Sequence, residues 1–85
     1  MLKKEIVINN ETGLHARPAA EFVKAAAKFM SVISIDFKEK TINAKSIVHV
    51  LSAGIAAGSA IVISAEGEDE KQAIEVLSDV VKNLK

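Results

Sequence analysis

In the segment Val32–Phe37, the five residues from Ile33 onward alternate strictly between apolar and polar side chains, and this pattern constrains the fold more than any other feature. The apolar positions are Ile33, Ile35 and Phe37, and the polar ones between them are Ser34 and Asp36. Successive side chains of a strand point to opposite faces, so the pattern predicts a strand that is buried on one face. A sheet built from such strands needs covering on that face only.

The rest of the chain predicts three more strands and three helices. The strands are expected at residues 4–9, 41–43 and 60–65, and the helices at 16–29, 47–53 and from residue 70 onward. The first helix carries an apolar stripe at spacings of three and four, formed by Ala19, Phe22, Val23, Ala26, Phe29 and Met30. Gly54 is expected to form a left-handed cap after the second helix. Residues 38–40 are expected to form a charged hairpin turn.

The last helix has the clearest boundaries. Asp69 is expected to cap it, with Glu70 in its first turn and Gln72 at a spacing like that of a capping box. Lys82 and Lys85 suit its C-terminal end. Its predicted buried stripe consists of Ala73, Val76, Leu77, Val80, Val81 and Leu84.

These elements follow the order βαββαβα, with one apolar face on each strand and one apolar stripe on each helix. The arrangement that buries every stripe is a four-stranded, mainly antiparallel sheet covered on one face by three helices. The fold class is therefore α+β, an open-faced sandwich. With 85 residues, the chain is expected to form a single domain over residues 1–85 and to be monomeric.

Composition excludes several classes of function. Eleven basic and eleven acidic residues give a net charge of zero, which argues against nucleic-acid binding. The chain has no cysteine and therefore no disulfide or thiolate site. It lacks the ~18-residue apolar run of a membrane-spanning segment, so no membrane insertion is expected. These features favour a cytoplasmic location.

The segment 13–18, with the sequence Gly-Leu-His-Ala-Arg-Pro, places a histidine at the predicted start of a helix. Proline is tolerated in the first turn, where backbone N–H groups have no intrahelical acceptor, and such a turn binds anions. His15 is therefore a candidate phosphoryl acceptor; a surface or capping role is the alternative. The only other histidine is His49, and no carboxylate cluster has metal-ligand spacing beside either, so no metal site is expected.

Phosphoryl acceptance needs an accessible imidazole nitrogen and donors for the phosphate oxygens. Arg17 provides a planar, permanently charged fork suited to phosphate. The backbone N–H groups of Ala16 and Arg17 are further donors. Thr12 is a candidate contact or orienting residue through its hydroxyl group.

A second site is predicted around the short helix at 47–53. Ser46 has the position of its N-cap. The apolar residues Ile47, Val48 and Leu51 are more than one buried stripe requires, so some are expected to be exposed and to form a protein-docking surface. The alternative is a well-buried short helix.

Three motifs together resemble the HPr family, the histidine-containing phosphocarriers of the bacterial phosphoenolpyruvate:sugar phosphotransferase system. Residues 13–19 resemble its active-site motif, residues 43–47 its second motif, and residues 63–70 its third. The spacing between the motifs also matches, and the similarity covers essentially the whole chain.

The resemblance implies that His15 receives a phosphoryl group from phosphoenolpyruvate by way of enzyme I, on the ring nitrogen nearer the backbone. His15 would then pass the group to IIA domains of sugar transporters, with Arg17 binding the phosphate and assisting transfer. The chain would be a carrier and not an enzyme, and it would need no cofactor. Ile47, Val48 and Leu51 would belong to the surface that meets enzyme I and the IIA domains.

In many Gram-positive relatives the serine that corresponds to Ser46 is phosphorylated by an ATP-dependent kinase, so the resemblance implies regulatory phosphorylation there. A serine kinase/phosphatase and a transcriptional co-regulator would then be further partners. The chain departs from those relatives at Val48 and His49, where methionine and glycine are common, and this bears on both interactions. Two alternatives stay open: a regulatory adaptor, and a nitrogen-branch phosphocarrier paralogue with different partners.

Overall fold

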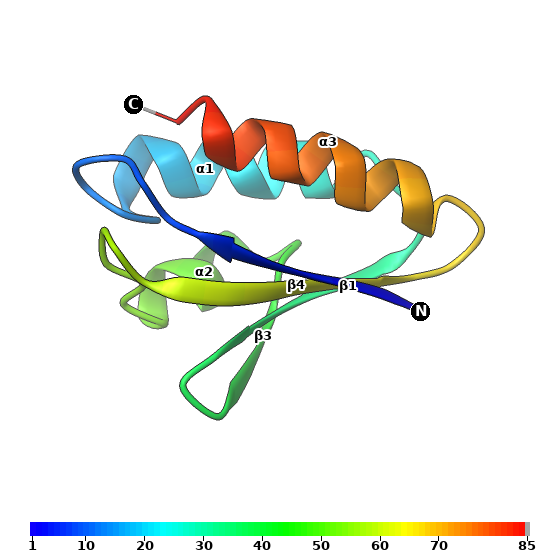
Figure 1. The fold of residues 1–85 in the computed structure, drawn as a ribbon, viewed down its shortest axis with the longest axis horizontal. Helices are drawn as coiled ribbons and strands as arrows, with labels where there is room; N and C mark the ends of the chain where they lie inside the picture. Colours follow the sequence, from blue (N-terminus) through cyan, green and yellow to red (C-terminus); the bar gives the residue numbers. More distant parts are fainter. Residues whose placement is uncertain (85) are drawn as a thin grey trace.

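The computed structural model describes residues 1–84 and contains the elements in the predicted order (Figure 1). Their bounds are β1 (Leu2–Val7), α1 (Ala16–Ala26), β2 (Val32–Phe37), β3 (Lys40–Asn43), α2 (Ile47–Ser52), β4 (Ala60–Glu66) and α3 (Glu70–Lys82). The four strands form a sheet in the order β1-β4-β2-β3, and each neighbouring pair is antiparallel. The predicted open-faced α+β sandwich is confirmed.

The two long helices run side by side in opposite directions over the sheet (Figure 1). The start of α1 and the end of α3 therefore lie at one end of the molecule, and the end of α1 and the start of α3 at the other. The short helix α2 packs against α1 and β3. This pairing of helix ends decides which residues surround the first turn of α1.

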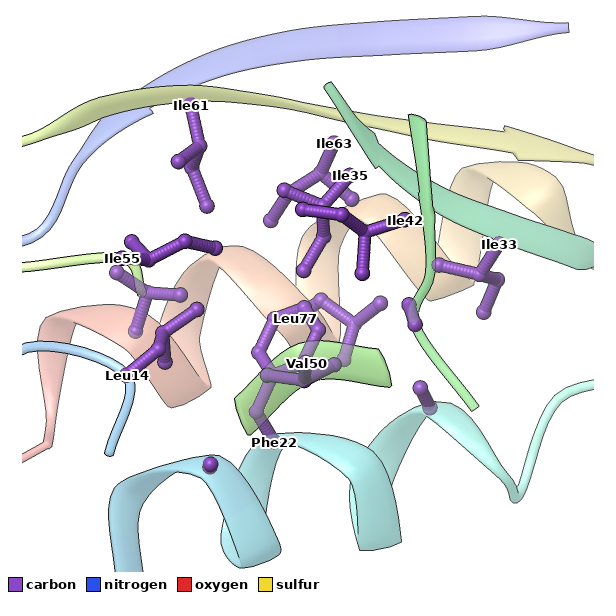
Figure 2. Packing of buried hydrophobic residues seen from close by; sticks show 14 of the residues in the cluster. Leu14, Phe22, Ile33, Ile35, Ile42, Val50, Ile55, Ile61, Ile63 and Leu77 are labelled. Carbon is purple, nitrogen blue, oxygen red and sulfur yellow. The ribbon is translucent and has the colours of Figure 1, made fainter. Parts of the chain in front are cut away.

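The core lies between the sheet and the helices (Figure 2). The predicted inward faces of β2 and β4 are confirmed, because Ile33, Ile35, Phe37, Ile61 and Ile63 are all buried. Phe22 of α1 and Leu77 of α3 meet them from the helical side, and both are fully buried. Burying one such side chain stabilises the fold by about 1.5–3 kcal/mol, so the core holds both helices firmly on the sheet.

Helix α1 is shorter than predicted. It ends at Ala26, and the next residues form i→i+3 bonds, from Lys28 N to Ala25 O (3.2 Å) and from Phe29 N to Ala26 O (3.2 Å). The helical spacing is therefore lost before Met30, which is 87% exposed instead of part of the stripe. The prediction for Met30 is wrong because the apolar pattern continued past the end of the helix.

The N-terminal boundary of α3 is confirmed, and the helix ends at Lys82, before Leu84 of the predicted stripe; two further details differ from the prediction. Asp69 has the N-cap position, yet its carboxylate makes no hydrogen bond to the helix that it precedes. Val76 is exposed, and Ile74 is buried in its place, since the buried stripe runs along a different line of the helix. Lys85 lies outside the described residues.

Smaller shifts affect the first strand and the hairpin. β1 ends at Val7, so Ile8 is buried beyond the strand, where its N–H donates to Ser59 O (2.9 Å). Lys38 and Glu39 both have positive φ (48° and 66°), as a two-residue hairpin turn requires. The expected left-handed cap at Gly54 is confirmed by a φ of +67°.

Candidate functional site

The loop between β1 and α1 fixes the position of His15. Leu14 is buried, and its N–H donates to Ile55 O (2.9 Å) in the segment that follows α2. Gly13 has a φ of +72°, and a Cβ there would lie 2.5 Å from Ile55 O, so only glycine fits. The buried Asn10 side chain donates from Nδ2 to Gly13 O (3.0 Å). The residue before His15 is thus anchored by packing and by backbone hydrogen bonds.

His15 is exposed at the N-cap position of α1, with extended backbone angles (φ −134°, ψ 149°). Its side chain makes no capping hydrogen bond. The capping alternative considered from the sequence is therefore not realised. The imidazole faces solvent on a backbone that the preceding residues hold in place.

The first backbone N–H groups of α1 have no hydrogen-bond acceptor within the helix. Ala16 and Arg17 are its first two residues, and N–H groups at these positions have no carbonyl one turn earlier to accept from them. The first turn contains no acidic side chain. Ala16 has a φ of +50°, a left-handed conformation that costs an alanine about 1–2 kcal/mol. The arrangement favours an anion beside His15.

These residues surround a hollow of about 560 Å³. It is lined by Thr12, His15, Ala16, Arg17, Pro18, Glu21 and Asn83. The structure thus brings together all four predicted residues of the histidine site. Thr12 Oγ1 also accepts a long hydrogen bond from Asn10 Nδ2 (3.4 Å).

The sequence analysis missed Glu21 and Asn83. The spacing of four between Arg17 and Glu21 places both on one face of a helix, so this neighbour was within reach of sequence reasoning. Asn83 follows the end of α3 and donates from Nδ2 to Asp79 O (2.8 Å). Only the antiparallel packing of α3 on α1 brings it to the hollow, and no local pattern predicts that.

The second predicted site lies around α2. Ser46 Oγ accepts from His49 N (3.3 Å), which confirms the N-cap role of Ser46. Ile47, Val48 and Leu51 are exposed, so the short helix is not the well-buried element of the alternative interpretation. We call these three residues the α2 patch. The bond from Leu14 N to Ile55 O ties the segment after α2 to the residue before His15, so the α2 patch lies on an element joined to the histidine site.

Asp69 and Glu70 lie at the other end of the molecule, where their carboxylates accept hydrogen bonds from the protein itself. Asp69 accepts from Met30 N (2.8 Å), Ser31 N (2.9 Å) and Ser31 Oγ. These bonds, the Ser31 hydroxyl above all, lower the pKa of Asp69. Glu70 accepts from Gly67 N (3.2 Å), which lowers the pKa of Glu70, and a contact with the N-terminal amine (3.2 Å) adds to this effect.

Residues 1–84 contain neither a metal-binding cluster nor a membrane-spanning helix. No three histidine or acidic side chains gather closely enough to hold a metal ion. None of the helices in this range is both long and apolar enough to span a bilayer.

Fold and site together define a small α+β sandwich that presents one exposed histidine, beside an arginine, at the start of a helix. A family model described as "PTS HPr component phosphorylation site" matches residues 2–83. The phosphocarrier protein HPr of Buchnera aphidicola subsp. Schizaphis graminum (strain Sg) is 51% identical over 84 residues, which cover 99% of each chain. The chain therefore belongs to the HPr family of phosphocarrier proteins.

Solved structures agree with this assignment. HPr-C-His from Thermoanaerobacter tengcongensis superposes with a TM-score of 0.94 at 48% identity, over 96% of this chain and 92% of that one. The phosphocarrier protein HPr from Bacillus anthracis str. Ames gives 0.90 at 42% identity, over 93% and 94%. The fold is therefore the HPr fold over nearly its whole length.

Proposed function

We propose that His15 accepts a phosphoryl group from phosphorylated enzyme I and donates it to IIA domains of sugar transporters. The phosphoenolpyruvate that charges enzyme I is the ultimate donor, and the chain acts in the cytoplasm as a single-domain carrier. The observation that carries the proposal is the exposed His15 imidazole at the first turn of α1, in one hollow with Arg17. Membership of the HPr family supports it.

The attacking atom is the ring nitrogen nearer the backbone, Nδ1. Its lone pair forms the new N–P bond while the bond from phosphorus to the donor group of enzyme I breaks, and that group leaves with the electron pair. The attacking nitrogen must be the unprotonated one, so the proton resides on Nε2. Arg17 then donates hydrogen bonds to the phosphoryl oxygens, and the N–H groups of Ala16 and Arg17 do the same. Thr12, which lines the same hollow, helps to orient the acceptor.

A carrier must bind the phosphoryl group weakly enough to release it. A helix N-terminus stabilises an exposed anion by about 0.3–1 kcal/mol. Each 1.4 kcal/mol changes a transfer equilibrium about tenfold, so a deeply stabilised phosphohistidine would not be passed on. The exposure of the His15 side chain to solvent suits reversible transfer.

The α2 patch is the surface on which enzyme I and the IIA domains dock. Its side chains are exposed apolar groups beside the histidine site, as a transient protein interface requires. Ser46 lies directly before this helix and is the proposed site of regulatory phosphorylation by a serine kinase. A phosphate there adds about −1.5 to −2 charge to the docking surface and so weakens the binding of partners that the unmodified surface accepts.

The acceptor is tested by incubating the chain with enzyme I and labelled phosphoenolpyruvate, then treating the product with acid. We expect acid-labile label, because phosphohistidine hydrolyses in acid and phosphoserine does not. His15→Ala should abolish labelling, and His49→Ala should retain it. His49 is the matched control because it is the only other histidine and is also exposed. Label that persists in His15→Ala would overturn the proposal.

Ser46 is tested separately with ATP and an HPr serine kinase. We expect acid-stable label in the wild-type chain and none in Ser46→Ala. If neither protein is labelled, the regulatory role is excluded and the carrier role at His15 is unaffected.

A further inference from the structure

We propose that Glu21 sets how readily the phosphoryl group leaves His15, by keeping a negative charge in the hollow that receives the group. This inference rests on the proposed phosphorylation of His15. Glu21 does not bind the phosphoryl group. Its carboxylate instead repels the group and so makes the phosphorylated form of His15 less favourable.

The placement of Glu21 is the first argument. It lies four residues after Arg17 on α1 and lines the same hollow as His15. It also lines a second hollow, of about 350 Å³, between α1 and α3. Glu21 therefore stands where the two hollows meet. Of the residues that line the His15 hollow, Glu21 alone carries a carboxylate.

The lack of a counter-ion is the second argument. Across residues 1–84, no basic group forms an ion pair with Glu21. Neither Arg17, one turn earlier, nor Lys24, three residues later, neutralises it. The second hollow adds another carboxylate, that of Asp79, and no basic side chain. Within the described residues the carboxylate of Glu21 is therefore held in no ion pair, and the basic side chain that shares its hollow is that of Arg17.

The sign of the effect follows from charge. The phosphoryl group brings about −1.5 to −2 charge, and a carboxylate in the same hollow raises the free energy of the phosphorylated form. Arg17 and the first-turn N–H groups lower it. Glu21 thus offsets part of the stabilisation that the helix terminus supplies, and it favours donation of the group to the next protein.

The experiment measures the equilibrium between phosphorylated enzyme I and the chain, from the amounts of the four dissociated species at the end point. This constant depends only on the free energies of the separate proteins. A change in docking affects rates and leaves the constant alone, so the readout isolates the charge effect. We expect Glu21→Gln to shift the constant about two- to fivefold toward the phosphorylated chain. The shift should shrink as the salt concentration rises.

Two further variants separate charge from shape. Glu21→Asp keeps the carboxylate and should stay close to wild type. Glu75→Gln removes an exposed carboxylate from α3 that lines neither hollow, and it should leave the constant unchanged.

The inference is overturned if Glu21→Gln leaves the constant at the wild-type value while His15 is labelled normally. It is also overturned if Glu21→Asp shifts the constant as far as Glu21→Gln does. Failure of the proposed function is a different result, because the wild-type chain would then take no label at His15.

Discussion

The two long helices begin in opposite ways. At the start of α3, Asp69 and Glu70 supply carboxylates, and these accept hydrogen bonds from the backbone of the protein itself. At the start of α1, the first turn contains no acidic residue, and His15 and Arg17 stand there exposed. Both termini have the same intrinsic preference for negative charge. One end satisfies it internally, and the other leaves it for an anion from outside.

One end of the molecule, the structural end, is thus held by internal hydrogen bonds, and the other, the reactive end, carries the histidine that we propose accepts the phosphoryl group. The carboxylate of Asp69 joins α3 to the segment that follows α1, across nearly forty residues of sequence. The His15 side chain, like that of Asp69, makes no capping bond to the helix that it precedes. The first turn of α1 holds no carboxylate against its own N–H groups, so these donors are open to the phosphoryl group that we propose His15 accepts.

The largest effect is expected from giving α1 the acid that α3 has. Arg17→Glu removes the guanidinium donors and adds repulsion against the incoming phosphoryl group. We expect the rate of phosphorylation by enzyme I to fall at least about 10²-fold, since a charge-assisted hydrogen bond contributes about 1.5–3 kcal/mol before repulsion is counted. Arg17→Lys keeps the positive charge but loses the planar guanidinium group, so its rate of phosphorylation should fall less than that of Arg17→Glu. Equal activity in Arg17→Glu and the wild type would break the comparison.

The loop before α1 supplies the next largest effect. Gly13→Ala combines a positive φ with a Cβ only 2.5 Å from Ile55 O, so the loop must move. We expect the free energy of unfolding in urea to fall by about 2–4 kcal/mol and phosphorylation to slow.

Gly54→Ala is the matched control for this change. Gly54 has a similar φ (+67°) and nothing within 4 Å of its Cβ position. Gly54→Ala should therefore lower the free energy of unfolding only by the cost of a left-handed alanine, about 1–2 kcal/mol. Equal losses in the two variants would show that the close approach to Ile55 does not hold the loop.

Each end of the molecule also carries an exposed valine, but only the valine at the histidine end belongs to the proposed docking surface. Val48 of α2 is 69% exposed near the reactive end, and Val32 is 70% exposed near the structural end, opposite Glu66. We expect Val48→Asp to lower kcat/KM for phosphorylation by enzyme I about tenfold, which corresponds to 1.4 kcal/mol of lost docking. Val32→Asp should leave it unchanged, and neither change should alter stability by more than about 0.5 kcal/mol. Equal effects of the two would argue against the α2 patch as the docking surface.

The smallest effect concerns the pH dependence of stability. Hydrogen bonds from Ser31 and Met30 lower the folded pKa of Asp69 below the ordinary value of 3.8. A carboxyl group with a lowered pKa stabilises the fold above its unfolded pKa, and this contribution is lost as the pH falls through the folded value. Thermal unfolding of Asp69→Asn should therefore start from a lower midpoint at neutral pH and fall less steeply than wild type below pH 3.8. A parallel decline in the two proteins would contradict the bonded role of Asp69.

Local patterns predicted most of the fold because each strand has one apolar face, as Ile33, Ile35 and Phe37 illustrate. They also predicted that Thr12, His15 and Arg17 lie together, because these residues are close in sequence. The errors arose where distant segments meet. Asp69 was expected to cap its own helix, but its carboxylate accepts from Ser31 N and Ser31 Oγ instead. The spacing of four between Arg17 and Glu21 could have predicted that Glu21 lies beside the histidine site, whereas Asn83 reaches the hollow only because α3 packs on α1.

The most direct test of the difference between the two helix starts is a comparison of backbone amide NMR signals before and after phosphorylation. The amide protons of Ala16 and Arg17 should move strongly downfield as they donate to the phosphoryl oxygens. Those of Glu70 and Lys71, in the first turn of α3, should stay in place. Unchanged signals at Ala16 and Arg17 in a chain phosphorylated on His15 would contradict the claim that the start of α1 binds the phosphoryl group.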